Sequence, residues 1–353
     1  MPGPKFKVVV QRTSGGTSLS EQNGYEMERE ALDPIGAEIV EIDAATEKEF
    51  IVGAHDADAI VGHNRRITKN IISNLATCKV IGLGSVGADT VDVDAATAHG
   101  IVVTNVPDIF IEEVADHTMA MLLAAFRRLP VMHKMVCDGH WSDGRPLLSR
   151  FPRLLGQTIG LISFGNVAKA VARRCHAFGL HVVAYDPYLS ELEMSSVNVE
   201  PETSLFALLR RSDFVSMHAP LNSETRHMLT ARHFKEMKQS AIFVNNGRGG
   251  TVDENALIQA LEKDQISAAA LDVFEAEPLT SDSPLLAMSN VLCSPHVASA
   301  SARMWPEALR RMGREIATVL TGRWPRSAVN PGVLPKTELH RWQPYPQTRG
   351  PNR

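Results

Sequence analysis

The sequence predicts an α/β protein built from two doubly wound parallel sheets, with the second domain inserted into the first. Three observations support this. Apolar runs of strand length alternate with helix-like stretches in two separate series. A Gly-, Pro- and Arg-rich stretch at residues 138–157 indicates a linker between the series. Long amphipathic stretches at about 111–128 and 302–320 flank the second series and are expected to be the crossings. At 353 residues the chain is long enough for two such domains.

The first series occupies the first third of the chain. Its apolar runs are KFKVVV, AEIVEI, DAIVG, KVIGLG and IVVTN, and a helical stretch, MEREAL, follows the first of them. Such runs separated by helices are typical of parallel strands in βα units. The stretch 111–128 then opens with acidic residues and closes with arginines, which is the polarity that a helix dipole favours.

The second series has the same character. Its apolar runs are TIGLIS, HVVAYD, DFVSMHA, AIFVNNG, AAALDVF and VLCSPH. A last helix ends near Gly322, and the tail 336–353 is polar and Pro-rich without an apolar period. We therefore predict a first domain of residues 1–107 plus 303–335, a second domain of 108–302, and a separate tail.

Composition excludes several classes of protein. The formal net charge is −4, so no basic surface argues for nucleic acid. The arginine pairs 127–128, 173–174 and 310–311 fall in helix-like segments, where a solvated face is expected. No apolar run approaches the roughly 20 residues of a membrane helix. The four cysteines form no C-x-x-C pair, so we expect no metal site, reduced thiols and a cytoplasmic protein.

Two glycine-bearing stretches compete for a dinucleotide. A dinucleotide fingerprint needs a strand before it, a helix starting on it, and an acid at the end of the next strand. GLGSVG, at 82–87, has the complete glycine spacing, but only a short helix follows it, at about 93–99. The next strand, IVVTN, ends without an acid. This stretch therefore fails the test.

SFGNVA, at 163–168, passes the test although two of its glycines are replaced. A strand precedes it, the helical VAKAVARRCHAF follows, and the next strand ends on Asp186. Gly165 keeps the position where phosphates approach the backbone, and Ala168 suits close helix–strand packing. Ser163 is the real departure, at some strain if the turn demands a glycine conformation. A carboxylate at Asp186 binds ribose hydroxyls and repels a 2′-phosphate, so NAD is favoured over NADP.

Chemistry-bearing residues follow three later strands of the second series. Those strands lead to Arg248, to Asp272 and Glu277, and to His296. Ligands of doubly wound sheets bind outside the carboxyl ends of the strands, so these side chains should converge. A guanidinium can grip a 2-oxo acid, and an imidazolium can protonate the developing alkoxide. A carboxylate orients the imidazole and stabilises its charged form. Asp272 is suited to accept a hydrogen bond from a nicotinamide carboxamide.

These stretches together resemble the D-2-hydroxyacid dehydrogenase family, which includes phosphoglycerate dehydrogenase, hydroxypyruvate/glyoxylate reductase, formate dehydrogenase and the C-terminal-binding co-repressor. The resemblance spans about residues 79 to 300. It rests on KVIGLGSVGADTVDVDAATAHGIVVTN, EEVADHTMAMLLAAFRR, the SFGNVA…YDPY unit, DFVSMHAPLNSETRHML, FVNNGRGGTVDENAL, LDVFEAEP and SPHVASAS. It implies a flavodoxin-like substrate domain, a Rossmann NAD domain, and a catalytic set of Arg248, Glu277 and His296.

The resemblance also implies further site residues. It gives the GLGSVG loop a role, since the family uses this loop to present backbone N–H groups to the substrate carboxylate. Substrate binding is thereby expected at Ser85, Val86, Gly87 and Arg248. The cofactor is expected to meet Thr118, Gly165, Asn166, Val167, Asp186, His218, Thr225, Asn246, Gly247, Arg248, Asp272 and His296. The family usually carries a hydroxyl residue and then Ala or Ser before the arginine, where this chain has Asn246–Gly247.

The resulting hypothesis is an NAD-dependent dehydrogenase for a small 2-hydroxy acid of the glyoxylate or hydroxypyruvate type, and the resemblance further implies a homodimer. One alternative is an NAD(H)-sensing co-repressor-like protein. Another is formate dehydrogenase, which Glu277 disfavours because that branch typically has a neutral glutamine near the histidine. Arg65 or Arg66 is a candidate to accept a second acidic group of the substrate, with a surface role for both equally open. His63 is a candidate to touch substrate.

Overall fold

The computed structural model of the chain describes residues 5–12, 19–62, 65–148 and 152–341. Contacts divide the chain into two units. Unit 1 comprises Met1–Ile109 and Ser301–Arg353, and unit 2 comprises Phe110–Ala300. The predicted boundaries, 107/108 and 302/303, lie two residues away from these divisions. His63 lies outside the described residues.

Unit 1 contains a parallel sheet of five strands, ordered β2-β1-β3-β4-β5. This is the flavodoxin-like order that the resemblance implied. The strands coincide with the five apolar runs: β1 (Phe6–Gln11), β2 (Ala37–Ile42), β3 (Ala59–Val61), β4 (Val80–Gly82) and β5 (Val102–Thr104). Alternate residues of β1 enter different cores, Val8 on one face and Val9 on the other. The sheet is therefore buried on both faces, which explains its continuous apolar runs.

Helices cover both faces of this sheet. The helices of unit 1 are α1 (Leu19–Gln22), α2 (Glu26–Leu32), α3 (Glu47–Ala54), α4 (Lys69–Ser73), α5 (Val93–Ala98) and α14 (Met304–Leu320), with 3₁₀ turns η1 (Asp33–Ile35) and η5 (Pro331–Lys336). α2 and α14 pack on one face, and α3, α4 and α5 on the other. A Cβ on Gly82 would lie 2.6 Å from Cδ1 of Ile316, so this glycine lets α14 approach β4 closely.

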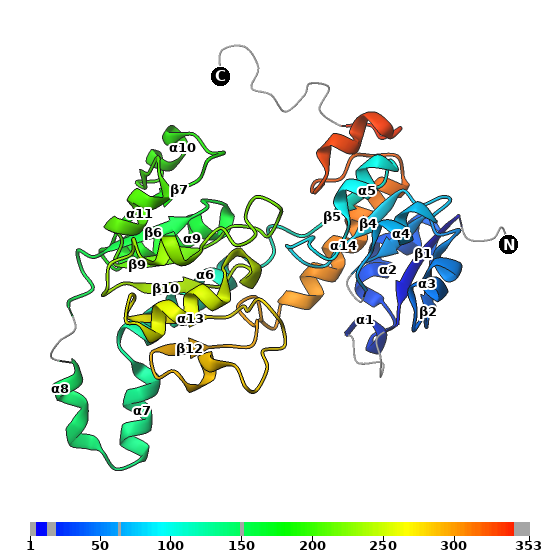
Figure 1. Cartoon of the computed structure of the whole chain (residues 1–353). Coiled ribbons are helices and arrows are strands. Elements are labelled where there is room, and N and C mark those ends of the chain that lie inside the picture. Colours follow the sequence, from blue (N-terminus) through cyan, green and yellow to red (C-terminus); the bar gives the residue numbers. More distant parts are fainter. Residues whose placement is uncertain (1–4, 13–18, 63–64, 149–151, 342–353) are drawn as a thin grey trace. The chain divides into compact units, whose positions relative to one another are not determined.

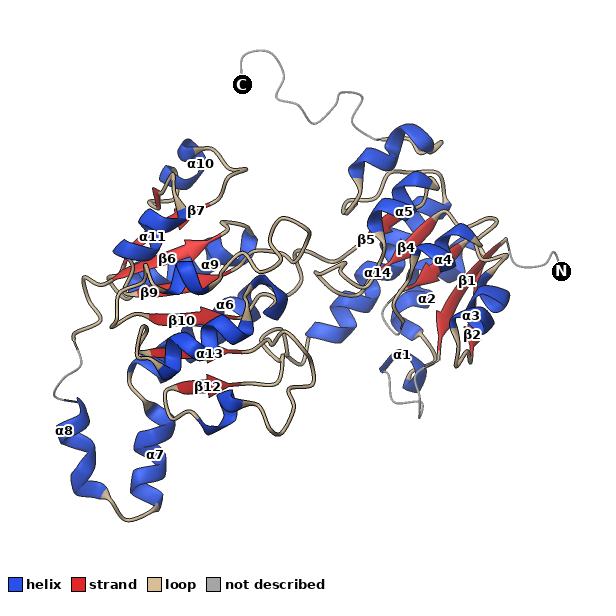
Figure 2. Ribbon diagram, in the orientation of Figure 1, coloured by secondary structure: helices blue, strands red, loops and turns tan. Residues whose placement is uncertain are grey.

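Unit 2 contains a parallel sheet of seven strands, ordered β12-β11-β10-β9-β6-β7-β8, drawn as one layer of arrows in Figure 2. Its strands are β6 (Thr158–Ile162), β7 (His181–Tyr185), β8 (Glu200–Pro201), β9 (Phe214–Met217), β10 (Ile242–Asn245), β11 (Ala268–Leu271) and β12 (Val291–Cys293). The order reverses between β6 and β9, which makes the loop after β6 the switch point of a Rossmann sheet. β8 was not predicted, since its two residues carry no apolar run.

Two sets of helices enclose the sheet of unit 2 (Figure 1). α6 (Ile111–Phe126) and α9 (Asn166–Ala177) pack on one face; α11 (Leu205–Arg211), α12 (Ala231–Phe234) and α13 (Glu254–Glu262) pack on the other. Smaller elements are α10 (Glu191–Ser195), η3 (Gly249–Thr251) and η4 (Pro284–Ala287). No helix among the described ranges is long and apolar enough to cross a bilayer.

Two stretches differ from the prediction. The expected linker 138–157 contains η2 (Trp141–Asp143) and α8 (Gly144–Leu148), which follow α7 (Leu129–Cys137). Its glycines and proline concealed a helical hairpin, because Gly144 and Pro146 stand at the first positions of α8, where a helix tolerates them. The predicted tail, residues 336–353, was expected to be separate from the first domain, but its start is hydrogen-bonded to that domain. The N–H of His340 donates to the carbonyl of Gly322 (2.9 Å), and the backbone N–H of Trp324 donates to the carbonyl of His340 (3.0 Å).

Candidate active site

The loop after β6 presents an open helix N-terminus. Ser163 follows the strand with a φ of +68°, the left-handed conformation that favours glycine. Gly165 then caps α9 without a side-chain cap. Among the described residues, the amides of Asn166, Val167 and Ala168 donate to no protein acceptor. A Cβ on Gly165 would meet no atom within 4 Å. Unpaired amides beside open space form an anion site of the kind that holds a pyrophosphate.

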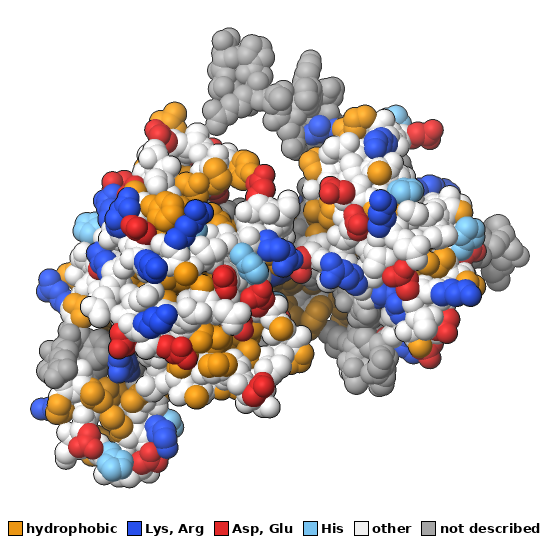
Figure 3. Space-filling model, in the orientation of Figure 1, with side chains coloured by type: hydrophobic (Ala, Val, Ile, Leu, Met, Phe, Trp, Pro, Cys, Tyr) orange, Lys and Arg blue, Asp and Glu red, His pale blue; other side chains and the backbone are white. Residues whose placement is uncertain are grey.

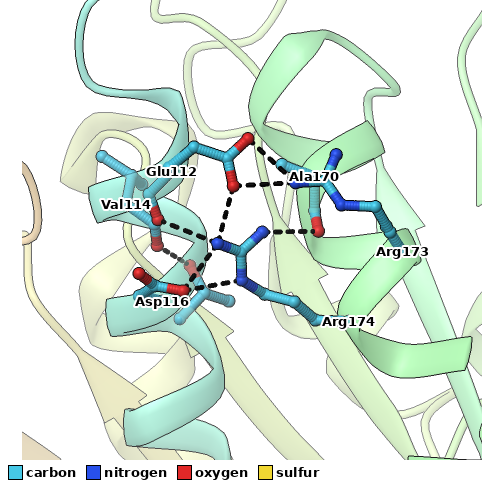
Figure 4. A network of polar contacts seen from close by, with 7 residues as sticks. Glu112, Val114, Asp116, Ala170, Arg173 and Arg174 are labelled. Carbon is cyan, nitrogen blue, oxygen red and sulfur yellow. Dashed lines mark hydrogen bonds and ion pairs between the residues drawn. The ribbon is translucent and has the colours of Figure 1, made fainter. Parts of the chain in front are cut away.

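α6 anchors the helix that begins at this loop (Figure 4). Arg174 of α9 lies 2.7 Å from Glu112 and 2.6 Å from Asp116, and Arg173 also reaches Glu112, at 2.7 Å. The expectation of a purely solvated face is therefore wrong for Arg174, whose side chain is only 19% exposed. The two acids at the start of α6 instead hold α9 against it.

Asp186 directly follows β7 and ties the phosphate loop to its own turn. Its carboxylate accepts hydrogen bonds from the N–H of Phe164 (2.9 Å), the N–H of Tyr188 (2.9 Å) and the hydroxyl of Ser163 (3.3 Å). A carboxylate has about four acceptor positions. Three donors therefore fix its orientation and leave capacity for a ribose hydroxyl. Tyr188 in turn hydrogen-bonds to Glu224.

His296 and Glu277, which the sequence predicted to act as an acid–base pair, are in direct contact. Nδ1 of His296 lies 2.7 Å from Oε2 of Glu277, while Oε1 of Glu277 accepts from the N–H of Phe274 at 3.0 Å. With Nδ1 engaged by the carboxylate, Nε2 is the nitrogen left to exchange a proton with a substrate. The imidazole is 45% exposed on its side-chain surface. The arrangement is that of an oriented general acid and base.

The carboxylate of Asp272 fixes the turn that contains His296. The side chain is fully buried at the end of β11 and accepts from the N–H groups of Val297 (3.0 Å) and Ala298 (2.8 Å). Ser294 donates its hydroxyl to the same carboxylate at 2.5 Å. His296 takes a φ of +52° in this turn, and its N–H donates to the Asp272 carbonyl at 2.8 Å. The contact predicted between Asp272 and a carboxamide remains a prediction.

Arg248 follows β10 in a tightly held loop. Oδ1 of Asn245 accepts from the N–H of Gly247 (3.1 Å), and Nδ2 of Asn245 donates to the Arg248 carbonyl (3.2 Å). Nη1 of Arg248 donates to the Gly247 carbonyl at 2.9 Å. A Cβ on Gly249 would lie 1.9 Å from the carbonyl oxygen of Phe274. The arginine loop thus touches the backbone of the 272–277 loop, which leads to Glu277.

The remaining predicted cofactor residues lie at the same carboxyl edge or brace it. The amide of Asn246 shares a 3.2 Å hydrogen bond with the hydroxyl of Thr118, and both side chains are buried. Thr225 closes its own turn through the Pro220 carbonyl and the Asn222 N–H. His218 lies 2.9 Å from the Ser216 hydroxyl, and burial lowers the pKa of its imidazole to about 4. His218 is therefore neutral at pH 7 and able to accept a hydrogen bond.

Sequence reasoning missed three parts of this arrangement. Asn245 and Gly249 flank the predicted arginine, and the doubled glycine after Arg248 was the available signal. His117 has Nε2 at 3.1 Å from the Ser294 hydroxyl and 3.5 Å from Oδ1 of Asp272. No sequence signal links these residues, because they come from α6, β11 and the end of β12.

The substrate loop predicted in unit 1 also has open amides. The carbonyl of Ser85 accepts from the N–H of Val106 (3.0 Å), and that of Val86 accepts from Nδ2 of Asn105 (2.6 Å). In the described part of the chain, the amides of Ser85, Val86 and Gly87 donate to no protein acceptor. The loop's carbonyls are thus engaged and its N–H groups are available, which is what an anion nest requires.

Arg65 has a structural role in unit 1. Its guanidinium donates to Oε1 of Gln11 (3.3 Å) and to the carbonyl of Ala44, and it lies 5.2 Å from the centre of the Phe50 ring. Among the described residues, no group of three His, Cys, Asp or Glu side chains is arranged to hold a metal ion.

Comparison with known proteins identifies the family of the chain. Residues 119–298 match the model of the "D-isomer specific 2-hydroxyacid dehydrogenase, NAD binding domain". The glyoxylate reductase of Thermofilum pendens is 34% identical over 94% of this chain and 98% of its own length. The chain belongs to the D-isomer specific 2-hydroxyacid dehydrogenase family.

Other members of this family differ in length and cofactor. The D-3-phosphoglycerate dehydrogenase of Methanocaldococcus jannaschii is 36% identical over 87% of this chain, which spans only 59% of that relative. A solved glyoxylate/hydroxypyruvate reductase of Sinorhizobium meliloti, described as NADPH-dependent and in complex with NADP and malonate, is 29% identical with a TM-score of 0.77. The match covers 92% of this chain and 97% of that one. The family model confirms an NAD-binding domain but does not distinguish NAD from NADP.

Proposed function

We propose that the chain is an NAD-dependent D-2-hydroxyacid dehydrogenase that reduces a small 2-oxo acid of the glyoxylate or hydroxypyruvate type. The observation that carries this is the 2.7 Å contact between His296 and Glu277, held in place by the buried Asp272. A protonated imidazole beside a carboxylate suits a reaction that must deliver a proton as well as a hydride. Formate oxidation requires no such proton transfer.

Each residue then has a defined task. Arg248 binds the carboxylate and keto oxygen of the 2-oxo acid through paired hydrogen bonds. The open amides of Ser85, Val86 and Gly87 bind carboxylate oxygen. When bound, the reduced nicotinamide supplies the hydride that C2 receives. His296 donates its proton to the oxygen, so that the C2 carbonyl becomes CH–OH, and it takes the proton back in the reverse direction. Glu277 orients the imidazole and stabilises its charge.

The fit of a dinucleotide rests on the residues after β6 and β7. The unpaired amides at the start of α9 suit the pyrophosphate, and Asp186 suits the ribose hydroxyls. The fixed carboxylate would repel a 2′-phosphate, which supports NAD over NADP. The Sinorhizobium meliloti relative is described as NADPH-dependent, so the two cofactors must be compared directly.

The test is NADH oxidation by the purified protein with glyoxylate, hydroxypyruvate, pyruvate, phenylpyruvate and 2-oxoglutarate, and with NADPH in parallel. We expect turnover of glyoxylate or hydroxypyruvate with NADH. His296→Gln should lower kcat by roughly 10²–10⁴-fold. Arg248→Ala should lower kcat/KM by at least about 100-fold, since it removes two charge-assisted hydrogen bonds. Tight NADH binding without turnover of any acid would contradict the enzyme and favour an NAD(H) sensor.

A homodimer is the second part of the proposal. The described residues of α7 include no buried side chain, and the hairpin exposes Leu129 (53%), Val136 (54%) and Trp141 (77%). Figure 3 shows hydrophobic side chains gathered on this hairpin. Apolar exposure of this kind marks an interaction site. We expect sedimentation to give twice the monomer mass, and Trp141→Asp to shift it towards the monomer. A monomeric wild-type protein would contradict this part alone.

A further inference from the structure

A recess of about 880 Å³ lies within unit 1, away from every residue assigned above. α14 forms one wall with Arg314 and Thr318, and the end of α2 with η1 forms another with Pro34 and Ile35. α2 leads from the carboxyl end of β1 to the amino end of β2, so the recess lies towards the amino edge of the sheet. The substrate loop follows the carboxyl end of β4. The volume falls in the range of small-molecule sites.

Arginines without a carboxylate partner are gathered around the recess. Five arginines line it, at positions 311, 314, 323, 326 and 341. Arg311 is paired with Glu315, at 2.5 Å, and these two charges cancel. Throughout the described chain, no hydrogen-bond or ion-pair partner exists for the guanidinium groups of Arg314, Arg323, Arg326 and Arg341. The recess therefore carries four uncompensated positive charges.

Several arginines elsewhere in the described chain are paired with carboxylates, and others such as Arg66 and Arg127 lie singly and not around a recess. Carboxylate partners are found for Arg12, Arg29, Arg173, Arg174, Arg210, Arg211 and Arg310. Figure 3 shows the same pattern on the visible face, where basic and acidic side chains are interspersed. The four positive charges also exceed what is needed to offset the dipole and cap the C-terminus of α14. Its C-terminal dipole is equivalent to about half a negative charge, and its last carbonyls are already capped by the N–H groups of Thr321, Gly322 and Arg323.

The rest of the lining is apolar and aromatic. Trp324 is half-buried, and it lines the recess together with Pro325, Ala31 and Ile35. The backbone of Trp324 is held, since its N–H donates to the His340 carbonyl at 3.0 Å. The N–H of Arg326 is fixed as well, by Oε2 of the buried Glu315 at 2.9 Å. An indole beside several guanidinium groups suits a ligand with a flat ring and a polyanionic group.

We propose that this recess binds a nucleoside polyphosphate, with the phosphates on the arginines and the base against Trp324. A triphosphate carries about four negative charges at neutral pH, which matches the four uncompensated guanidinium groups. Arginine forms bidentate hydrogen bonds with phosphate oxygens, which lysine cannot reproduce. The site is separate from the dinucleotide loop of unit 2 and does not depend on the proposed dehydrogenase activity.

Calorimetric titration tests the proposal. ATP, ADP, pyrophosphate and adenosine are titrated into the full chain under saturating NADH, so that the dinucleotide loop does not compete. We expect one ATP per chain, weaker binding of pyrophosphate, and an affinity that falls as salt rises. Arg323→Ala/Arg326→Ala should weaken ATP at least tenfold, because two charge-assisted contacts are lost. Arg210→Ala/Arg310→Ala removes the same charge from carboxylate-paired arginines and should leave the affinity unchanged.

A separate variant tests the proposed contact between the base and Trp324. Trp324→Leu should weaken ATP several-fold and leave pyrophosphate unaffected, since the indole contacts only the base. Thermal denaturation confirms that each variant is folded. Absence of saturable ATP binding, or equal loss in both double variants, would overturn the proposal. Equal affinities for ATP and pyrophosphate, unchanged by Trp324→Leu, would overturn the assignment of a nucleoside.

Discussion

The loops after β4 and β6 both leave the carboxyl edge of a parallel sheet, yet they expose their amides in different ways. After β6, α9 begins at Asn166, and its first amides point along a helix axis. After β4, no helix begins until Val93, and the amides of Ser85–Gly87 are open because the loop's carbonyls are held by Asn105 and Val106. A helix N-terminus suits an extended pyrophosphate, and an isolated nest suits a single carboxylate.

The glycines of the two loops also differ in purpose. Gly82, the first glycine of GLGSVG, lies in β4 beneath Ile316 of α14. Gly165 faces open space at the start of α9. A glycine can therefore serve close packing in one loop and ligand approach in the other, although both belong to the same kind of motif. The glycine spacing alone does not distinguish a packing glycine from a ligand-binding glycine. The secondary-structure element that follows the loop does distinguish them.

The largest effect should come from Gly165→Val. The added side chain occupies the space where we expect the pyrophosphate, so the Kd for NADH should rise by at least about 100-fold, or ~2.7 kcal/mol. Folding should change little, because a Cβ meets nothing within 4 Å. Fluorescence titration measures the Kd.

The matched change in the other loop is Gly82→Ala. Its Cβ would lie 2.6 Å from Ile316, so the free energy of unfolding should fall by about 1–3 kcal/mol, with the NADH affinity of the folded protein retained. Denaturant unfolding measures the change in the free energy of unfolding. If the two variants showed the same phenotype, the distinction between packing and ligand glycines would be wrong.

Asp186→Ala should have the next largest effect. It removes the acceptor of Phe164 and Tyr188 as well as the proposed ribose contact. NADH affinity should fall by roughly 10- to 30-fold, as expected for loss of a charge-assisted hydrogen bond. NADPH should lose less or gain, because the repulsion of its 2′-phosphate disappears. The ratio of the two Kd values is the measurement, and an unchanged ratio would exclude Asp186 as the discriminating group.

Asn105→Ala tests the loop after β4, which we expect to bind the substrate carboxylate. Nδ2 of Asn105 holds the Val86 carbonyl at 2.6 Å, so its removal loosens the nest without touching unit 2. The variant also removes the acceptor of the Ser327 hydroxyl, which is outside the loop. Loss of the hydrogen bond to the Val86 carbonyl, about 0.5–1.5 kcal/mol, should raise KM for the 2-oxo acid about 2- to 10-fold. The Kd for NADH should stay constant. A change in NADH affinity with constant KM would reverse the assignment of the two loops.

Much of this arrangement was predictable because it depends on local pattern. Apolar runs located every strand except β8, and the position of residues after strands gathered Arg248, Glu277 and His296 at one edge. The supports of these residues were not predictable. Gly249 matters because a Cβ there would lie 1.9 Å from the carbonyl oxygen of Phe274, and His117 matters through its contact with Ser294. Both relations exist only after the chain has folded. The helix α8 was missed because Gly144 and Pro146 at its start resemble linker residues.

Ser163→Gly should have the smallest effect, and its sign distinguishes strain from function. Ser163 adopts a φ of +68°, which costs a non-glycine residue about 1–2 kcal/mol. The glycine variant gains backbone entropy when unfolded, at a cost of roughly 0.5–1 kcal/mol, and loses the 3.3 Å contact with Asp186. A net stabilisation below about 1 kcal/mol is therefore expected in denaturant unfolding. NADH affinity should hold, because Phe164 and Tyr188 still fix the carboxylate; if it fell by about tenfold or more, the serine hydroxyl would be orienting Asp186, and the departure from glycine would serve cofactor binding.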